Sequence, residues 1–142
     1  RLEHIYGKYD KLNKFIPSII KKIKTRNIIT LNSPNNIRDF TPVEHITNFC
    51  KILKDKGYKK NYINIGTGIP QSTFNFVDKL IKYYAKNNNS YFYKKNRIIE
   101  IKNSENDFLK TSFCLEPKLS KDYTNEYFKN LEIKTFKEIF YD

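Results

Sequence analysis

Apolar and polar positions along the chain follow two periods, one typical of strands and one typical of helices. Short segments in which apolar residues alternate or run together predict strands at 2–6, 28–31, 62–65, 98–101 and 113–115. Apolar residues that recur three or four positions apart predict helices at 15–24, 43–53, 72–84, 117–127 and 135–141. Strands that alternate with helices in this way indicate an α/β fold with parallel strands.

The ends of these helices carry the residues that helix termini prefer. Pro17 fits the first turn of its helix, where a missing N–H costs little. Lys54, Lys56 and Gly57 follow the second helix in the order expected for a C-terminus, and Ser72 is a suitable N-cap for the third. The boundaries of the first three helices are therefore predicted as well as their presence.

Composition leaves two kinds of partner open. The chain has 142 residues, which fits one domain, and a formal net charge of +12 with a pI near 9.6. Such a charge is compatible with a basic nucleic-acid-binding module, which we keep as the alternative function. The sequence is also rich in Lys, Asn, Ile and Tyr and has Ala only at position 85, the usage expected from A/T-rich codons. Much of the charge can therefore come from codon bias, and we expect no membrane partner.

Cysteine usage and the apolar runs bear on the compartment. Cys50 and Cys114 both stand among apolar residues, so we expect small buried side chains in a reducing compartment. With two histidines, Cys/His metal spacing is absent, and no metal is predicted. No apolar run reaches the roughly twenty residues of a membrane span, and no signal peptide is visible, so a cytoplasmic location is expected. The chain starts at Arg1 and contains no Met, which indicates a fragment.

Arg38 is the leading candidate for ligand binding. It follows a strand and a polar turn and stands shortly before a helix that opens at Pro42. A planar guanidinium can bind two oxygens of a phosphate or carboxylate at once. The alternative is an ordinary ion pair with Asp39 or another acid, which this stretch alone favours.

Other candidate motifs are weaker. Residues 66–71 lie between a strand and a helix, as a dinucleotide-binding turn would, but the last glycine is missing and Pro70 stiffens the turn. A tight strand-to-helix turn is the better interpretation. Tyr91 and Lys95 have a Tyr-x-x-x-Lys spacing that such a tyrosine-rich and lysine-rich chain produces by chance. His4 stands near the end of a strand, where ligands gather in open α/β sheets, although a lone histidine is more often structural.

Several segments, taken in order, resemble one family. They are RLEHIYG at 1–7, KFIP at 14–17, RDFTPVEH at 38–45, NIGTG at 64–68 and EPKL at 116–119. These are similar to the Arg-x-x-Asn-Val-Tyr-Gly strand, the Asn-Leu-apolar-Pro helix start, the Arg-Asp-Phe-Val-Tyr-Val-Asp-Asp segment, the Asn-apolar-Gly-Thr-Gly turn and the Asp-x-x-Lys-apolar segment of the NAD-dependent epimerase/dehydratase family. This family of extended short-chain dehydrogenases acts on nucleotide sugars.

The resemblance implies a specific part of such an enzyme. It covers the carboxyl-terminal half only, so residues 1–7 and 61–68 would be the last parallel strands of a Rossmann-type sheet. The rest of residues 1–142 would form the small substrate-binding α/β subdomain. The nucleotide-binding glycines and the catalytic Tyr-x-x-x-Lys would precede Arg1. NAD or NADP would then be bound mainly outside this chain, and no catalytic residue is expected within it.

By the same resemblance, four residues would bind a nucleoside diphosphate sugar. Arg38 would hold the diphosphate, and Leu31 would pack against the base. His4 and Lys14 stand where the family has Asn residues that contact the substrate, and His45 replaces a family acid. The form of the first segment is most similar to members that make deoxyhexoses for bacterial surface polysaccharides.

Three further expectations follow for the whole protein. The intact protein would be an epimerase, dehydratase or reductase, and it could be a homodimer. The fragment alone would be inactive, since it lacks the strands against which its helices should pack. We therefore expect exposed apolar surface on it.

Overall fold

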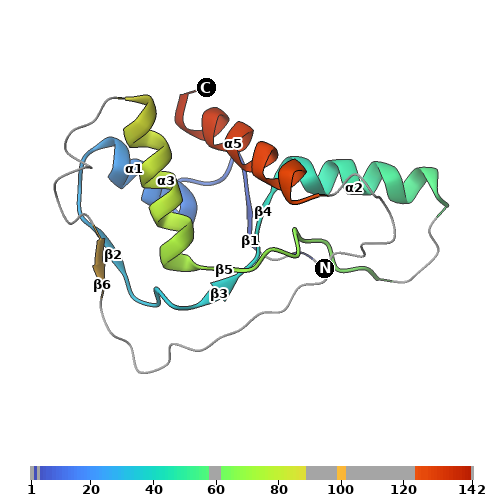
Figure 1. Cartoon of the computed structure of the whole chain (residues 1–142), viewed down its shortest axis with the longest axis horizontal. Helices are drawn as coiled ribbons and strands as arrows, with labels where there is room; N and C mark the ends of the chain where they lie inside the picture. Colours follow the sequence, from blue (N-terminus) through green and yellow to red (C-terminus); the bar gives the residue numbers. More distant parts are fainter. Residues whose placement is uncertain (1, 3, 58–61, 89–98, 102–123, 142) are drawn as a thin grey trace.

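The computed structural model describes residues 2, 4–57, 62–88, 99–101 and 124–141, which form helices around short pairs of strands (Figure 1). The strands are β1 (His4–Tyr6), β2 (Ile29–Leu31), β3 (Ile37–Arg38), β4 (Phe40–Pro42), β5 (Gln71–Ser72) and β6 (Ile99–Ile101). The helices are α1 (Phe15–Lys24), α2 (Val43–Asp55), α3 (Thr73–Asn87) and α5 (Asn125–Tyr141). The α/β class predicted from the sequence is confirmed.

The strands pair over long sequence distances. β1 lies parallel to β4, with His4 opposite Phe40 and Tyr6 opposite Pro42. β2 lies parallel to β6, and a single parallel bridge joins Leu2 to Ile65. β3 and β5 form an antiparallel pair, which the expectation of parallel strands did not include. This pair is only two residues long on each strand, too short for an apolar alternation to reveal it.

Two of the predicted elements differ in extent. Within 62–65, only Ile65 pairs with another segment, through its bridge to Leu2. An alternation of apolar residues forms a strand only where a neighbouring strand hydrogen-bonds to it. The two helices predicted near the carboxyl terminus correspond to α5, which is continuous from Asn125 to Tyr141. The strand predicted at 113–115 and the start of the helix at 117–127 lie outside the described residues.

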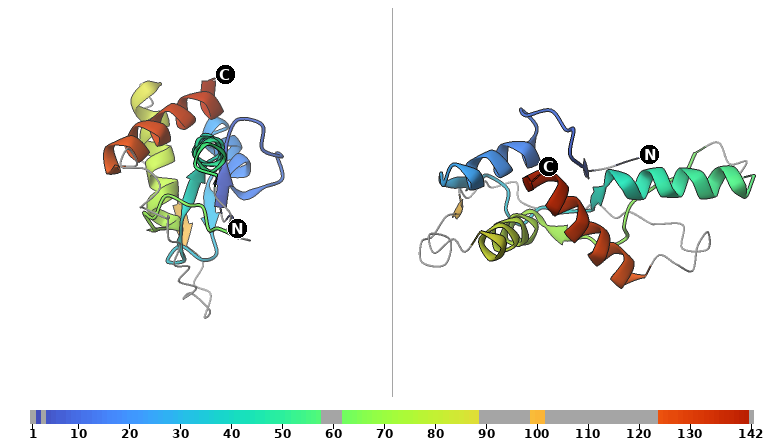
Figure 2. Two further views of the ribbon diagram at one scale, coloured as in Figure 1. Left: turned by 90° about the vertical axis from the view of Figure 1, so that its right-hand side faces the viewer. Right: turned by 90° about the horizontal axis from the view of Figure 1, so that it is seen from above.

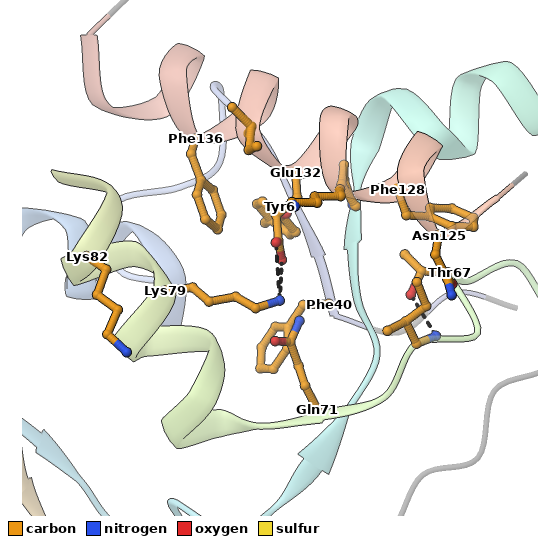
Figure 3. Close-up of a pocket in the computed structure, with 14 residues that line it drawn as sticks. Tyr6, Phe40, Thr67, Gln71, Lys79, Lys82, Asn125, Phe128, Glu132 and Phe136 are labelled. Carbon is orange, nitrogen blue, oxygen red and sulfur yellow. Dashed lines mark hydrogen bonds and ion pairs between the residues drawn. The ribbon is translucent and has the colours of Figure 1, made fainter. Parts of the chain in front are cut away.

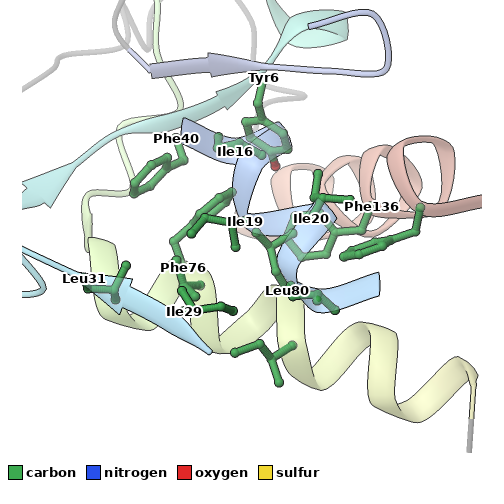
Figure 4. Close-up of a cluster of buried hydrophobic side chains, with 14 residues drawn as sticks. Tyr6, Ile16, Ile19, Ile20, Ile29, Leu31, Phe40, Phe76, Leu80 and Phe136 are labelled. Atoms are coloured by element: carbon green, nitrogen blue, oxygen red, sulfur yellow. The ribbon is translucent and has the colours of Figure 1, made fainter. Parts of the chain in front are cut away.

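The hydrophobic core lies where α1, α3 and α5 meet the strands (Figure 4). The buried face of α1 consists of isoleucines three or four residues apart, as the periodicity predicted: Ile16, Ile19, Ile20 and Ile23. Phe40 and Phe76 stack with ring centroids 4.0 Å apart and planes 9° apart. Phe136 from α5 meets Phe76 edge to face at 5.9 Å, so one aromatic cluster joins β4, α3 and α5.

α2 projects away from this core. In Figure 1 and in the view from above in Figure 2, its carboxyl-terminal end extends beyond the other helices. Its buried residues are His45 and Phe49, whereas Val43 is 48% exposed. The prediction that Cys50 is buried is wrong, because its side chain is exposed. Cys50 follows Phe49 directly and therefore points about 100° away from the buried side of the helix. Cys114 lies outside the described residues.

The predicted helix ends are confirmed for α2 and α3. The Ser72 hydroxyl accepts a hydrogen bond from the amide of Asn75 at 3.1 Å and so caps α3. Gly57 follows α2 with φ +59°, the left-handed conformation that glycine adopts without strain. No helix in the described part of the chain is long and apolar enough to cross a membrane.

Candidate functional site

A cleft lies beside β1 and the loop that follows it. It consists of two adjoining hollows of about 620 Å³ and 360 Å³, which share Ile5, Asp10 and Lys14. Gly7 and Val43 line the larger hollow, and His4 lines the smaller one. We call the two together the β1 cleft. The carboxyl ends of β1 and β4 meet here, which is where open α/β sheets bind ligands.

The structure brings two of the predicted site residues together in this cleft. His4, the first residue of β1, is exposed and meets Phe40 edge to face at 5.6 Å. Lys14 precedes α1, and its Nζ lies 2.7 Å from Oδ1 of Asp10. Its side chain is 59% exposed, so this ion pair is worth little and leaves the ammonium accessible to an anion.

Arg38 is placed by the antiparallel pair of β3 and β5. It lies opposite Gln71, and its Nη1 donates a hydrogen bond to the Ile37 carbonyl at 3.2 Å. The turn before β3 is fixed to the start of α3, because the amides of Thr73 and Phe74 donate to the carbonyls of Asn36 and Pro34 at 2.9 Å. Arg38 therefore stands on a segment that is attached to α3 and paired with β5. It is not among the described residues that line the β1 cleft.

Asp39 makes contacts that sequence reasoning missed. It is 1% exposed, and its carboxylate accepts hydrogen bonds from Thr41 Oγ1 at 3.2 Å, Thr67 Oγ1 at 2.6 Å and the Gly68 amide at 2.8 Å. The acid therefore joins β4 to the Gly-Thr-Gly turn. The signal was an Arg-Asp pair between the apolar residues Ile37 and Phe40, and nothing in the sequence names Thr67 as the partner of Asp39.

The same contacts decide what the Gly-Thr-Gly turn can do. The Gly68 amide is used by Asp39, and the Ile69 amide donates to Thr67 Oγ1 at 3.1 Å. These are the backbone donors that a dinucleotide-binding turn would offer to a pyrophosphate. The turn does not fit that group, and its residues act instead as a tight connection between a strand and a helix.

Leu31 lies in the hydrophobic core. It is 2% exposed and belongs to the cluster that includes Ile29 and Phe76. It is not among the described residues that line the β1 cleft. The structure therefore brings His4 and Lys14 together and places Arg38 and Leu31 on other parts of the fold.

A second cavity lies between α3, α5 and strands β1 and β4, with a volume of about 510 Å³ (Figure 3). We call it the aromatic pocket. Its walls include the rings of Tyr6, Phe40, Phe128 and Phe136, and Gln71 reaches it from β5. Lys79 of α3 and Glu132 of α5 form an ion pair across it, with Nζ–O distances of 3.3 and 3.2 Å. No sequence motif indicated this pocket.

Burial changes the pKa of two polar residues near these cavities. Tyr6 is 1% exposed, and burial together with the negative charges of Glu132 and Asp39 raises the pKa of its phenol well above the ordinary value. His45 is fully buried, and desolvation lowers the pKa of its imidazole, although the nearby Gly66 backbone and the charge of Asp39 oppose this. Tyr6 therefore remains a hydrogen-bond donor, and His45 is favoured as the neutral form.

Comparison with known proteins finds relatives over part of the chain. No family model matches. The CDP-abequose synthase of Salmonella muenchen is 39% identical over 70 residues, which are 48% of this chain and 24% of that protein. The CDP-abequose synthase of Salmonella typhimurium (strain LT2) is 36% identical over 81 residues, 54% of this chain and 27% of that protein. The matched segment thus spans about a quarter of the length of these relatives.

Solved structures share the fold over nearly the whole chain. A UDP-N-acetylglucosamine 4-epimerase from Methanobrevibacter ruminantium M1, in complex with UDP-N-acetylmuramic acid, has a TM-score of 0.64 at 17% identity, over 97% of this chain and 44% of that one. A dTDP-glucose 4,6-dehydratase from Bacillus anthracis in complex with NAD has a TM-score of 0.58 at 18% identity, over 97% and 42%. Both likenesses concern the fold, which is Rossmann-type.

None of these relatives is named as a nucleic-acid-binding protein, so the comparisons do not support that alternative. The sequence similarity and the shared fold agree with the ordered motifs. The predicted resemblance is confirmed as a likeness over part of the chain: the chain is similar in sequence to CDP-abequose synthases and in fold to a nucleotide-sugar 4-epimerase and a 4,6-dehydratase.

Proposed function

We propose that this chain is the nucleotide-sugar-binding part of an NAD(P)-dependent epimerase, dehydratase or reductase. The observation that carries the proposal is the 39% identity to a CDP-abequose synthase over 70 residues. That name also supports cytosine as the base of the nucleotide and bacterial surface polysaccharide as the destination of the sugar. As proposed, the protein works in the cytoplasm and can be a homodimer.

Within this proposal, four residues contact the substrate. Arg38 binds the diphosphate through its planar donors, supported by the rigid attachment of its segment to α3. His4 and Lys14 contact the sugar and the nucleotide, supported by their shared position in the β1 cleft. Leu31 contributes to the base site. Because Leu31 is buried, the side chains that cover this part of β2 would have to move before the base could contact it. Residues 1–7 and 61–68 belong to the main sheet, in line with the Leu2–Ile65 bridge.

The cofactor belongs to the part of the protein outside this chain. NAD or NADP would exchange a hydride with the sugar when bound there. The Gly-Thr-Gly turn of this chain does not fit a pyrophosphate, since its donors already serve Asp39 and Thr67. The residues of this chain therefore bind and orient the sugar nucleotide.

The test is calorimetric titration of CDP, UDP and dTDP into the full-length protein and its Arg38→Ala variant. We expect CDP to bind most tightly. We also expect Arg38→Ala to weaken binding by about 1.5 to 3 kcal/mol, the range for a hydrogen bond to a charged group.

Charge-preserving variants provide the control. Arg38→Lys keeps the charge but loses the two-point geometry, so we expect a partial loss of CDP affinity. Arg26→Lys makes the same change at an exposed residue after α1 and should leave affinity unchanged. Equal CDP affinity of Arg38→Ala and the parent would show that Arg38 does not bind the diphosphate.

A further inference from the structure

We propose that the aromatic pocket is a second ligand site, distinct from the proposed nucleotide-sugar site although Tyr6 lines both the pocket and the larger hollow of the β1 cleft. It would take a small aromatic anion that also carries an N–H or O–H donor. The inference stands on the walls of the pocket, on two buried polar atoms within it and on the charges around it.

The walls suit a flat ring. A volume of about 510 Å³ falls within the range of small-molecule sites. Phe40, Phe128 and Phe136 come from two different elements and line the pocket together, so a ring placed among them can stack or meet their edges. Phe40 is itself held by stacking on Phe76, which keeps this wall in place.

The Tyr6 hydroxyl supplies a donor without a partner. Its Oη is buried and has no hydrogen-bond partner among the described residues. Tyr6 lines the pocket, and its ring meets that of Phe136, another lining residue, at 6.2 Å. A buried donor left unpaired carries a desolvation penalty, which a ligand that accepts a hydrogen bond from it removes.

Gln71 supplies the complementary acceptor. Its Oε1 is also buried and lacks a partner within the described part of the chain. Gln71 is fixed in place by the pairing of β5 with β3. A ligand that satisfies both residues must therefore accept a hydrogen bond from Tyr6 and donate one to Gln71.

The charges around the pocket favour an anion. Lys79, Lys82 and Lys129 line it against one acid, Glu132. Glu132 is neutralised by Lys79, and Lys82 lies 2.6 Å from Asp78. Lys129 adds a further positive charge on α5, so a carboxylate in the pocket would meet a net positive surface.

Indole-3-acetate is a probe with these features: an aromatic ring, a carboxylate and one N–H donor. We expect it to bind the full-length protein with a stoichiometry of one, measured by calorimetry. 1-Methylindole-3-acetate lacks the donor and should bind roughly two- to tenfold more weakly, and 3-methylindole, which lacks the carboxylate, should bind weakly as well. This comparison uses the parent protein and needs no variant.

Two variants together identify the pocket as the site: Tyr6 also lines the β1 cleft, whereas Gln71 lines the aromatic pocket and is not among the described residues of the cleft. Tyr6→Phe removes only the unpaired hydroxyl and should reduce affinity for indole-3-acetate roughly tenfold. Gln71→Met should erase the difference between the methylated and unmethylated probes. Tyr83→Phe is the matched control, because Tyr83 packs on Phe136 from outside the pocket, and it should leave affinity unchanged.

Three results would overturn the proposal. The first is no saturable binding of indole-3-acetate up to about 1 mM. The second is equal affinity of Tyr6→Phe and the parent. The third is displacement of the probe by CDP in direct competition, which would place it in the nucleotide-sugar site.

Discussion

Asp39 shows how one buried side chain holds two distant segments together. Its carboxylate receives donors from Thr41, two residues along the chain, and from Thr67 and Gly68, 28 and 29 residues away. A buried carboxylate is tolerated only when its oxygens are hydrogen-bonded, and here three donors serve them. The acid beside the proposed diphosphate ligand therefore has a structural role that can be tested separately.

We expect Asp39→Ala to lower the free energy of unfolding by about 3 kcal/mol or more, because it leaves the buried donors unpaired. Asp10→Ala is the control, since Asp10 pairs with a Lys14 side chain that is 59% exposed, and it should cost less than about 1 kcal/mol. Urea denaturation of the full-length protein measures both. Similar losses for the two variants would contradict the assigned role of the Asp39 network.

His45 makes stability depend on pH. Burial lowers the pKa of the folded imidazole below the unfolded value of about 6.5, so protonation favours the unfolded chain. The stability contribution is complete above that pH, and we expect it to be lost as pH falls below 6.5 through the folded pKa. His45→Gln should flatten this decline in urea denaturation between about pH 7 and 5. His4→Gln, at an exposed position, is the control; an unchanged slope in His45→Gln would contradict the prediction.

At the scale of elements, α1 and α2 end in the same conformation with different residues. Arg26 after α1 has φ +57°, and Gly57 after α2 has φ +59°. At the end of α1, the amides of Arg26 and Asn27 donate to the carbonyls of Ile23 and Lys22. This left-handed position favours glycine and strains other residues. One helix therefore has the preferred residue at its end, and the other does not.

We expect Arg26→Gly to raise the free energy of unfolding by about 0.5 to 1 kcal/mol and Gly57→Ala to lower it by about 1 kcal/mol. Among the described residues, none beyond its chain neighbours has an atom within 4 Å of a Cβ built at position 57, so the expected loss there reports backbone strain. Lys24→Gly, inside α1, should destabilise by about 1 kcal/mol and shows that the gain is specific to the end of the helix. A loss in Arg26→Gly, measured by urea denaturation, would contradict this account.

The sequence predicted the elements whose signals are local. The isoleucines of α1 and the Ser72 cap of α3 are read from neighbouring residues, and both are confirmed. Pairings such as Asp39 with Thr67 depend on the topology, which brings together segments that no spacing connects. The sequence named His4 and Lys14 as substrate contacts; both line the β1 cleft, and the contact with substrate stays a prediction. The aromatic pocket needs α5 packed on α3 and could not be predicted from the sequence.

At the scale of the molecule, α2 has an apolar stripe turned away from α5. Glu44 and Asn48 face α5, where they contact Lys134 and Tyr127. The apolar positions lie on another side of the helix, at spacings of three and four residues, and Val43 and Cys50 among them are exposed. Exposed apolar side chains arranged on one side of a helix indicate a surface that packs against something. The chain covers 44% of the 4-epimerase whose fold it shares, so we propose that the corresponding remainder of a longer protein covers this surface.

We therefore expect α2 to be covered in the full-length protein. Cys50→Glu should lower the free energy of unfolding there by about 2 kcal/mol or more, because a charge would be buried. Lys51→Glu, one position further on the exposed side, should change it by less than about 0.5 kcal/mol. In the 142-residue chain alone, both variants should have small effects, and the amides of α2 should exchange hydrogen faster than those of α3. Equal exchange of α2 in the two proteins, with Cys50→Glu neutral in both, would show that the stripe faces solvent.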